Sequence, residues 1–229
     1  MTRLILDAGH GGSNSPGAVS KDGLREKDLT LQRILNLATS LSEYDCEIVL
    51  TRSNDSTVTL QQRVDIANQQ KGDFFYSDHS NSSEILTASG FESYISPNAY
   101  AKTKEFQKII HAAQAGVWKG ANRADRGMKT ASFFVLVKPV CSCILVEHGF
   151  LSNLQDVSLL RNAAFNKKIN DATVQAFVQC FNLQKKVVIK RLLLNGVQLG
   201  AFGTNDALIK AVTQLINENK YPIQIIEIK

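Results

Sequence analysis

Long hydrophobic runs are missing from this sequence. The longest, Cys141 to Val146, is far shorter than the roughly 18 residues that a membrane span needs. At the N-terminus only Leu4-Ile5-Leu6 separates Arg3 from Asp7, which is too short for the apolar part of a secretion signal. We therefore expect a chain that is made in the cytoplasm without a signal peptide and that has no membrane partner.

Cysteine is also scarce. The 4 cysteines of this 229-residue chain include no C-x-x-C pair, so we expect small buried apolar residues rather than a disulfide framework. Hydrophobic residues make up 44% of the chain and charged residues 21%, which supports a core and argues against global disorder. The length suits one large domain with a small appendage.

Through residue 182, short apolar segments alternate with amphipathic ones, a pattern typical of an α/β fold with a mostly parallel sheet covered by helices. The predicted strands are Leu4–Asp7, Glu47–Leu50, Phe74–Ser77, Phe91–Ile95, Phe133–Val137 and Cys141–Val146. The predicted helices are Glu26–Leu41, a segment capped by Thr59 that runs to about Gln69, Tyr100–Trp118 and Asn166–Phe181.

Residues 187–229 are predicted to form a separate small ββαβ domain. Two apolar segments flank Asn195-Gly196, a strong signal for a hairpin turn, and a helix from Asn205 to about Asn219 precedes a strand at Ile223–Ile228. A unit of this size rarely buries enough surface to stand alone, so we expect it to pack on the large domain or on a second copy.

The positive charge of the chain is concentrated in the same small domain. From Lys185 onward there are seven Lys and Arg residues against three Asp and Glu, a net charge of +4 out of +5 for the chain. This distribution indicates an acidic partner for the tail, with solubility as the alternative explanation.

Three polar clusters follow predicted strands, around His10, His79 and Glu147. Ligands of parallel α/β sheets bind beyond the carboxyl ends of the strands, so these clusters should meet at one edge, within reach of Glu26. Two His and one carboxylate form a known ligand set for catalytic zinc, and a second carboxylate can act as general base. The alternatives are that the histidines are structural and that the charge of Glu26 only interacts favourably with the dipole at a helix N-terminus.

Many motifs of this sequence resemble, in order, those of the third family of zinc N-acetylmuramoyl-L-alanine amidases. They are Leu6 to Gly12, Gly17-Ala18, Glu26 to Leu31, Val49 to Arg52, Leu60 to Arg63, Ala67-Asn68, Ser77-x-His79-x-Asn81, Gly90-Phe91-Glu92 and Val146 to Asn153. The resemblance runs from about residue 3 to residue 180 and implies a twisted, mostly parallel sheet. It also implies a peptidoglycan hydrolase that cuts the amide between N-acetylmuramic acid and L-alanine, with zinc on His10, Glu26 and His79 and with Glu147 as the catalytic glutamate.

Two residues depart from the family pattern. Asp78 replaces a small apolar residue before the second His, and by strand alternation it should point away from the side of His79, as a supporting or surface group. His148 replaces an apolar residue after the catalytic Glu; it could bind substrate, tune Glu147 or fill space. We name His148 and Asn81 as candidate substrate-binding residues.

Other activities explain fewer of these residues. A glycosidase would use Glu26 and Glu147 as paired carboxylates but leaves both histidines unexplained. A serine hydrolase would need G-x-S-x-G, which is absent. A wall-binding pseudo-amidase is disfavoured because all four site positions keep competent side chains.

The expected biological setting is the bacterial cell wall. The tail segment Val197 to Phe202 weakly resembles half of a sporulation-related repeat, a module that binds glycan, so residues 187–229 are expected to bind the wall, with a stabilising appendage as the alternative. Their net charge of +4 is expected to favour anionic wall polymers. A three-stranded unit of this size leaves a sheet face and an edge uncovered, so we also expect a homodimer. We expect no nucleic-acid partner. The resemblance favours an endolysin released through a holin-type pore, with a host autolysin or sporulation amidase as the alternative.

Overall fold

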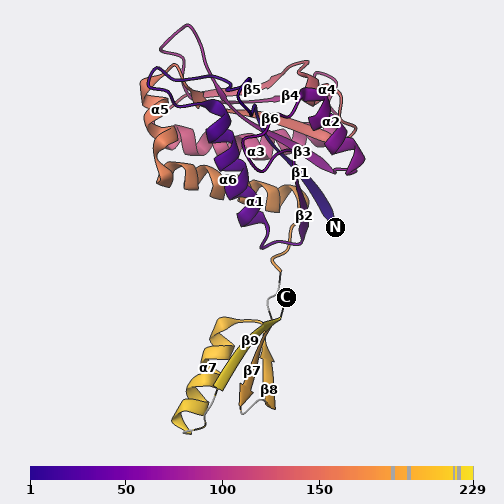
Figure 1. Ribbon diagram of the computed structural model, residues 1–229, viewed down its shortest axis with the longest axis vertical. Helices are drawn as coiled ribbons and strands as arrows, with labels where there is room; N and C mark the ends of the chain where they lie inside the picture. Colours follow the sequence, from indigo (N-terminus) through magenta and orange to yellow (C-terminus); the bar gives the residue numbers. More distant parts are fainter. Residues whose placement is uncertain (187–188, 195–196, 219, 221–222, 229) are drawn as a thin grey trace. The chain divides into compact units, whose positions relative to one another are not determined.

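The computed structural model describes residues 1–186, 189–194, 197–218, 220 and 223–228. The chain divides into two compact units, Met1–Gln184 and Lys185–Lys229 (Figure 1). No helix among the described residues is long and apolar enough to cross a membrane.

The larger unit is built on a six-stranded sheet, as the α/β prediction required. Its strands, in spatial order, are β2 (Cys46–Leu50), β1 (Thr2–Ala8), β3 (Phe74–Asn81), β6 (Ser142–Phe150), β4 (Phe91–Ile95) and β5 (Asp125–Thr130). Neighbouring strands are parallel except β6 and β4, which pair antiparallel. The expected mostly parallel sheet is therefore confirmed.

Helices cover both faces of this sheet (Figure 1). They are α1 (Glu26–Leu41), α2 (Leu60–Gln69), α3 (Ala101–Gly120), α4 (Phe134–Val137), α5 (Leu154–Arg161) and α6 (Ala163–Phe181). Because side chains alternate along a strand, Leu4 and Leu6 join the larger core with α1, α3 and α6, whereas Ile5 joins a smaller core with α2 and α4.

The helix ends follow local sequence signals. The capping box predicted at Thr59 is present: its Oγ1 accepts a bond from Gln62 N at 3.2 Å, and Gln62 Oε1 accepts one from Thr59 N at 2.8 Å. Such a cap contributes about 1 kcal/mol to helix stability.

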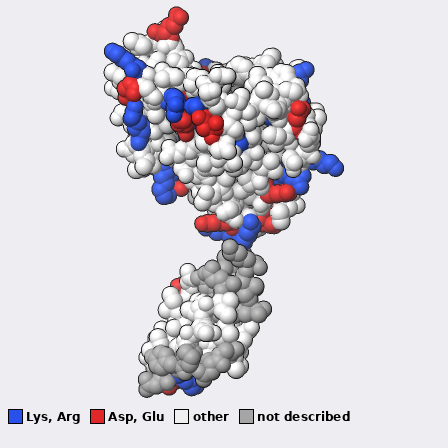
Figure 2. Space-filling model, viewed as in Figure 1, with Lys and Arg blue, Asp and Glu red and all other residues white. Residues whose placement is uncertain are grey.

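On the face drawn in Figure 2, the acidic and basic side chains of the larger unit are interspersed.

The prediction of a strand at Phe133–Val137 is wrong. This segment forms the short helix α4, because a continuous apolar run cannot be assigned to strand or helix by periodicity alone. The edge strand is instead β5, which local patterns did not predict because its charged residues and Gly127 have low strand propensity. Helix α5 was also missed, although its start is capped by the side chain of Asn153.

The smaller unit has the predicted ββαβ order. Strands β8 (Val197–Phe202), β7 (Ile189–Leu194) and β9 (Ile223–Ile228) form an antiparallel sheet in that order, and α7 (Asn205–Asn217) follows the cap residue Thr204. Leu192, Leu208 and Leu215 form its core. The predicted Asn195-Gly196 turn and the helix end at Asn219 lie outside the described residues.

Candidate metal centre and active site

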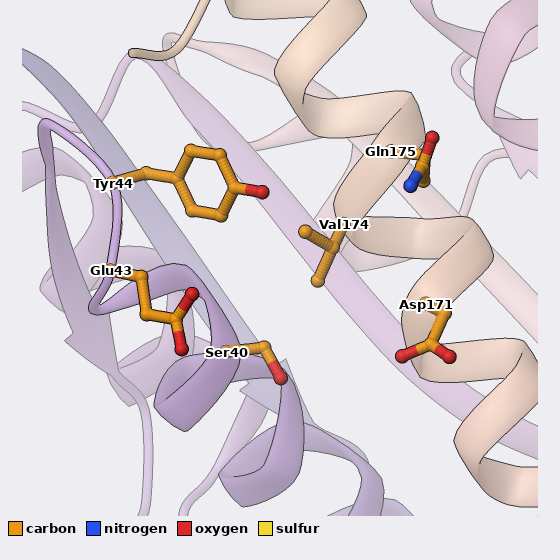
Figure 3. Close-up of a pocket in the computed structure, with 6 residues that line it drawn as sticks. All are labelled: Ser40, Glu43, Tyr44, Asp171, Val174 and Gln175. Carbon is orange, nitrogen blue, oxygen red and sulfur yellow. The ribbon is translucent and has the colours of Figure 1, made fainter. Parts of the chain in front are cut away.

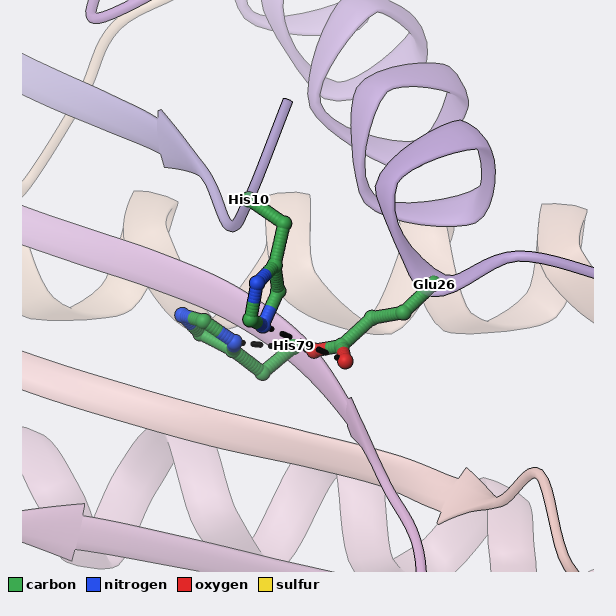
Figure 4. A group of neighbouring side chains, drawn as sticks. All are labelled: His10, Glu26 and His79. Carbon is green, nitrogen blue, oxygen red and sulfur yellow. Dashed lines mark hydrogen bonds and ion pairs between the residues drawn. The ribbon is translucent and has the colours of Figure 1, made fainter. Parts of the chain in front are cut away.

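His10, Glu26 and His79 meet at the carboxyl ends of two parallel strands (Figure 4). β1 and β3 are direct neighbours, with Ala8 paired to Asp78, so the turn after β1 lies beside the end of β3. Glu26 is the first residue of α1 and projects toward both histidines. The structure thus brings together the three residues that the sequence predicted as metal ligands.

Glu26 bridges the two histidines. Its Oε1 lies 2.9 Å from His79 Nδ1, and its Oε2 lies 3.2 Å from His10 Nε2. One nitrogen of each histidine and one oxygen of Glu26 all lie within 4.8 Å of one another. Glu26 is 4% exposed, and its oxygens also accept backbone N–H bonds from Ala18 at 2.8 Å and Ser80 at 3.0 Å. These bonds fix the carboxylate before any ligand binds.

Two glycines give the cluster the room it occupies. A Cβ at Gly9 would lie 2.4 Å from Cε1 of the His79 ring. At Gly17, which has a φ of +69°, a Cβ would lie 2.5 Å from Glu26 Oε2 and 2.8 Å from His10 Cδ2. Larger residues at these positions would displace the predicted ligands.

The electrostatics of the cluster follow from this geometry. Burial by itself raises the pKa of Glu26, but the hydrogen bonds and charges of His10 and His79 lower it well below its ordinary value. Burial likewise lowers the pKa of His79, yet the bond to Glu26 and the charge of Glu147 raise it to about 9. A cation at this position would replace the proton on His79.

Glu147 lies beside the cluster on β6. It is paired with His79 across the parallel strands β3 and β6, so both side chains project from the same face. Its Oε2 is buried and makes no hydrogen bond within the described part of the chain. Burial raises the pKa of Glu147, the charge of His79 lowers it in part, and the result is a pKa of about 8. A buried, unpartnered carboxylate oxygen next to a ligand cluster is suited to proton transfer.

Asn81, the other candidate substrate-binding residue, ends the same strand as His79. Its Nδ2 donates to Glu92 Oε1 at 2.7 Å, and its Oδ1 accepts a bond from Ser82 N at 2.8 Å. Its part in substrate binding stays a prediction.

The expectation that His148 binds substrate is wrong. Its side chain is fully buried on the opposite face of the sheet from Glu147, against Trp118 and Phe91. Trp118 Nε1 donates to His148 Nδ1 at 3.2 Å, and burial lowers the pKa of this histidine well below its ordinary value. The side chain therefore fills space in the core as a neutral ring.

Asp78 points away from His79, but it is not a surface group. It is 2% exposed, and its Oδ1 accepts bonds from Arg33 Nε at 2.8 Å and Arg33 Nη2 at 2.6 Å. The same Arg33 Nη2 donates to His79 O at 3.1 Å. The pair therefore ties α1 to the strand that carries His79.

A separate pocket lies between the end of α1 and α6. It is lined by Ser40, Glu43, Tyr44, Asp171, Val174 and Gln175 (Figure 3). It contains no histidine and none of the predicted site residues, so we assign it no part in the chemistry.

Comparison with known proteins identifies the fold and the chemistry together. The sequence profile of the N-acetylmuramoyl-L-alanine amidases matches residues 4–179. The chain belongs to this amidase family. The family is zinc-dependent, and its members hydrolyse peptidoglycan.

Named relatives of the amidase come from bacteria and from a phage. It is 39% identical over 204 residues to the sporulation-specific N-acetylmuramoyl-L-alanine amidase of Bacillus subtilis strain 168, covering 88% of this chain and 76% of the relative. The chain is 33% identical to the endolysin of Bacillus phage SPP1, over 81% of this chain and 69% of the endolysin. The catalytic domain of the amidase CwlV from Bacillus (Paenibacillus) polymyxa superposes with a TM-score of 0.74 at 28% identity, covering 80% of this chain and 100% of that domain.

Proposed function

We propose that this amidase binds zinc through His10, Glu26 and His79 and uses Glu147 as its general base. The bond to be cut is the amide between N-acetylmuramic acid and the L-alanine of the stem peptide. The observation that carries the proposal is the unpartnered, buried Oε2 of Glu147 beside a His–Glu–His cluster.

The donor set fits zinc. Two imidazole nitrogens and one carboxylate oxygen are typical ligands of a catalytic zinc site, which keeps a further position for water or substrate. The donor atoms already lie within 4.8 Å of one another, and they come from rigid elements, the ends of β1 and β3 and the start of α1. Zinc in such a site lowers the pKa of water to roughly 7 and polarises a carbonyl.

The protein residues would then handle the protons. Glu147 would take a proton from the attacking water and keep it until the amide bond breaks. It then gives the proton to the departing nitrogen of L-alanine, which is a poor leaving group unless it is protonated. Glu26 would remain a carboxylate ligand through both steps.

The Glu147→Gln variant tests this assignment. It keeps the size of the side chain but removes the base, so we expect hydrolysis of purified cell walls to fall by roughly 10²-fold or more while the zinc content stays at one ion per chain, as in the parent. Glu105→Gln, an exposed change on α3, is the matched control. Loss of zinc in Glu147→Gln would make Glu147 a ligand, and near-normal activity would remove it from the chemistry.

For the smaller unit we propose binding to the cell wall. Its support is the net charge of +4 from Lys185 onward and the exposure of apolar side chains on its sheet, including Val197, Leu199 and Ile225. Attraction to anionic wall polymers and pairing with a second copy would both use these features.

The endolysin role and release through a holin-type pore stay predictions. The relatives include both a phage endolysin and a sporulation-specific amidase. The identity of 39% to the latter favours a sporulation enzyme as the second candidate. Cells that make the chain internally test the endolysin role: they should stay intact until the membrane is permeabilised and then lyse, and cells that stay intact after permeabilisation would contradict it.

A further inference from the structure

A second acidic residue lies one strand beyond Glu147. Glu92 on β4 is paired with Glu147 across β6 and β4, so His79, Glu147 and Glu92 form one row on the same face of the sheet. Neighbouring strands are about 4.8 Å apart, which places Glu92 about two strand spacings from His79. Glu92 is 2% exposed and therefore belongs to the floor of the site rather than to its rim.

Two cations converge on this buried carboxylate. Glu92 Oε2 accepts bonds from Arg126 Nε at 2.8 Å and Lys129 Nζ at 2.5 Å, while Oε1 accepts from Asn81 and Tyr94. One negative charge thus faces two positive ones. The side chains of Arg126 and Lys129 are 33% and 36% exposed, so the surplus positive charge is open to solvent next to the catalytic residue.

An irregularity in β5 puts both cations on one face. Residues 126 and 129 are three apart and would project to opposite faces of a regular strand. However, Phe91 of β4 pairs with Asp125, whereas Ser93, two residues later, pairs with Met128, three residues later. The strand β5 therefore carries one extra residue opposite Glu92. Gly127, with a φ of +87°, takes up this bulge. Bulges commonly redirect side chains beside active sites.

Arg126 is held so that one edge of its guanidinium stays available. Its Nε is bound to Glu92, and its Cζ lies 4.7 Å from the centre of the Phe150 ring. Nη1 and Nη2 make no hydrogen bond to any residue in the described ranges. Such a pair of nitrogens matches the two oxygens of a carboxylate.

We propose that Arg126 and Lys129 bind a carboxylate of the stem peptide on the L-alanine side of the bond to be cut. The inference rests on the proposed function and adds specificity to it. The carboxyl group of the muramic acid lactyl chain is consumed in that amide bond, so a free carboxylate near the site must belong to the peptide. We assign the position one strand beyond Glu147 to a residue that follows L-alanine, because one strand spacing of about 4.8 Å is little more than the length of one extended residue.

Two matched soluble muropeptides test this site, one with a free carboxylate on the residue after L-alanine and one with a carboxamide there. We expect the full chain to favour the carboxylate by tenfold or more in kcat/KM, chiefly through KM. Arg126→Gln and Lys129→Gln should bring this ratio toward 1. Arg126→Lys keeps the charge but loses the two-nitrogen edge, and should give an intermediate ratio. Lys108→Gln, an exposed change on α3, should keep the parent ratio.

Each outcome separates the two proposals. A parent ratio near 1, or a tenfold ratio that persists in Arg126→Gln, overturns the carboxylate site and leaves the amidase assignment intact. Failure of the full chain to cut either peptide overturns the proposed function, and the carboxylate site with it. Unfolding curves that match the parent show that a lost ratio does not come from lost structure.

Discussion

Glu147 and His79 are direct partners across the parallel strands β3 and β6. This pairing places a raised-pKa carboxylate beside a predicted metal ligand without any contribution from a flexible loop. Because the register of the two strands sets the relationship, it depends on the sheet core and not on a bound substrate.

The glycine at position 17 is expected to be a requirement of the metal site. In Gly17→Ala the new Cβ would meet Glu26 and His10, so zinc affinity should fall by roughly tenfold or more. Gly23→Ala is a close control: Gly23 also has a positive φ, +87°, but nothing lies within 4 Å of its Cβ position. Both changes carry similar backbone strain, about 1 kcal/mol or more. Equal zinc affinities in competition titrations would contradict the proposed crowding.

Stability of the zinc-free protein should fall as the pH rises. His79 and Glu147 both bind a proton more tightly in the folded chain than in the unfolded one, because their folded pKa values are about 9 and about 8 against ordinary values of 6.5 and 4.5. The free energy of unfolding should therefore decrease between pH 6.5 and 9 for His79 and between pH 4.5 and 8 for Glu147.

Urea unfolding of the chelator-treated protein across this range measures the effect. Glu147→Gln should show a shallower decrease below pH 8 than the parent, because it lacks one of the two titrating groups. A stability that increases with pH, or parallel curves for the parent and the variant, would show that the two side chains do not share this environment.

Asp78 should be important for stability although it lies outside the metal cluster. Asp78→Ala leaves the guanidinium of Arg33 buried without its partner, and breaking a buried ion pair in this way costs about 3–5 kcal/mol. Asp22→Ala, which breaks the exposed pair with Arg161, should have a far smaller effect. The free energy of unfolding in urea checks both. Part of the lost stability should return in the double variant Arg33→Met/Asp78→Ala, and no recovery would contradict the explanation.

The two units should separate chemistry from wall binding. A chain ending at Gln184 keeps the entire core of the larger unit, so it should bind zinc and cut soluble muropeptides as the full chain does. It should bind purified walls and clear intact cells poorly. Wall binding by the full chain should weaken as salt rises, since charges are screened within about 10 Å at 0.1 M salt. Unchanged lysis by the shorter chain would contradict wall binding by the tail, and a monomer in light scattering at micromolar concentration would contradict self-association.

Much of this molecule could be predicted from its residues. Strand alternation and helical periodicity predicted the main elements, and the convergence of strand ends brought His10, Glu26 and His79 together as expected. What local patterns missed depends on partners distant in sequence. β5 is a strand because it pairs with β4, and α4 is a helix although its residues are apolar and β-branched in part.

The same limit applies to the side chains around the site. Strand alternation predicted that Asp78 faces away from His79, but only the packing of α1 and α3 shows that Asp78 and His148 are both buried there. The convergence of Arg126 and Lys129 on Glu92 depends on a bulge. The Arg126-Gly127 pair in an otherwise polar segment was the available signal, since glycine often marks a bulge in a strand.

Anomalous diffraction at the zinc edge tests the central claim most directly. Crystals of the full chain purified without chelator should show one strong anomalous peak between His10, Glu26 and His79, and the peak should persist in Glu147→Gln. A peak at another group of residues, or none in crystals of a protein that still hydrolyses cell walls, would contradict the proposed metal centre.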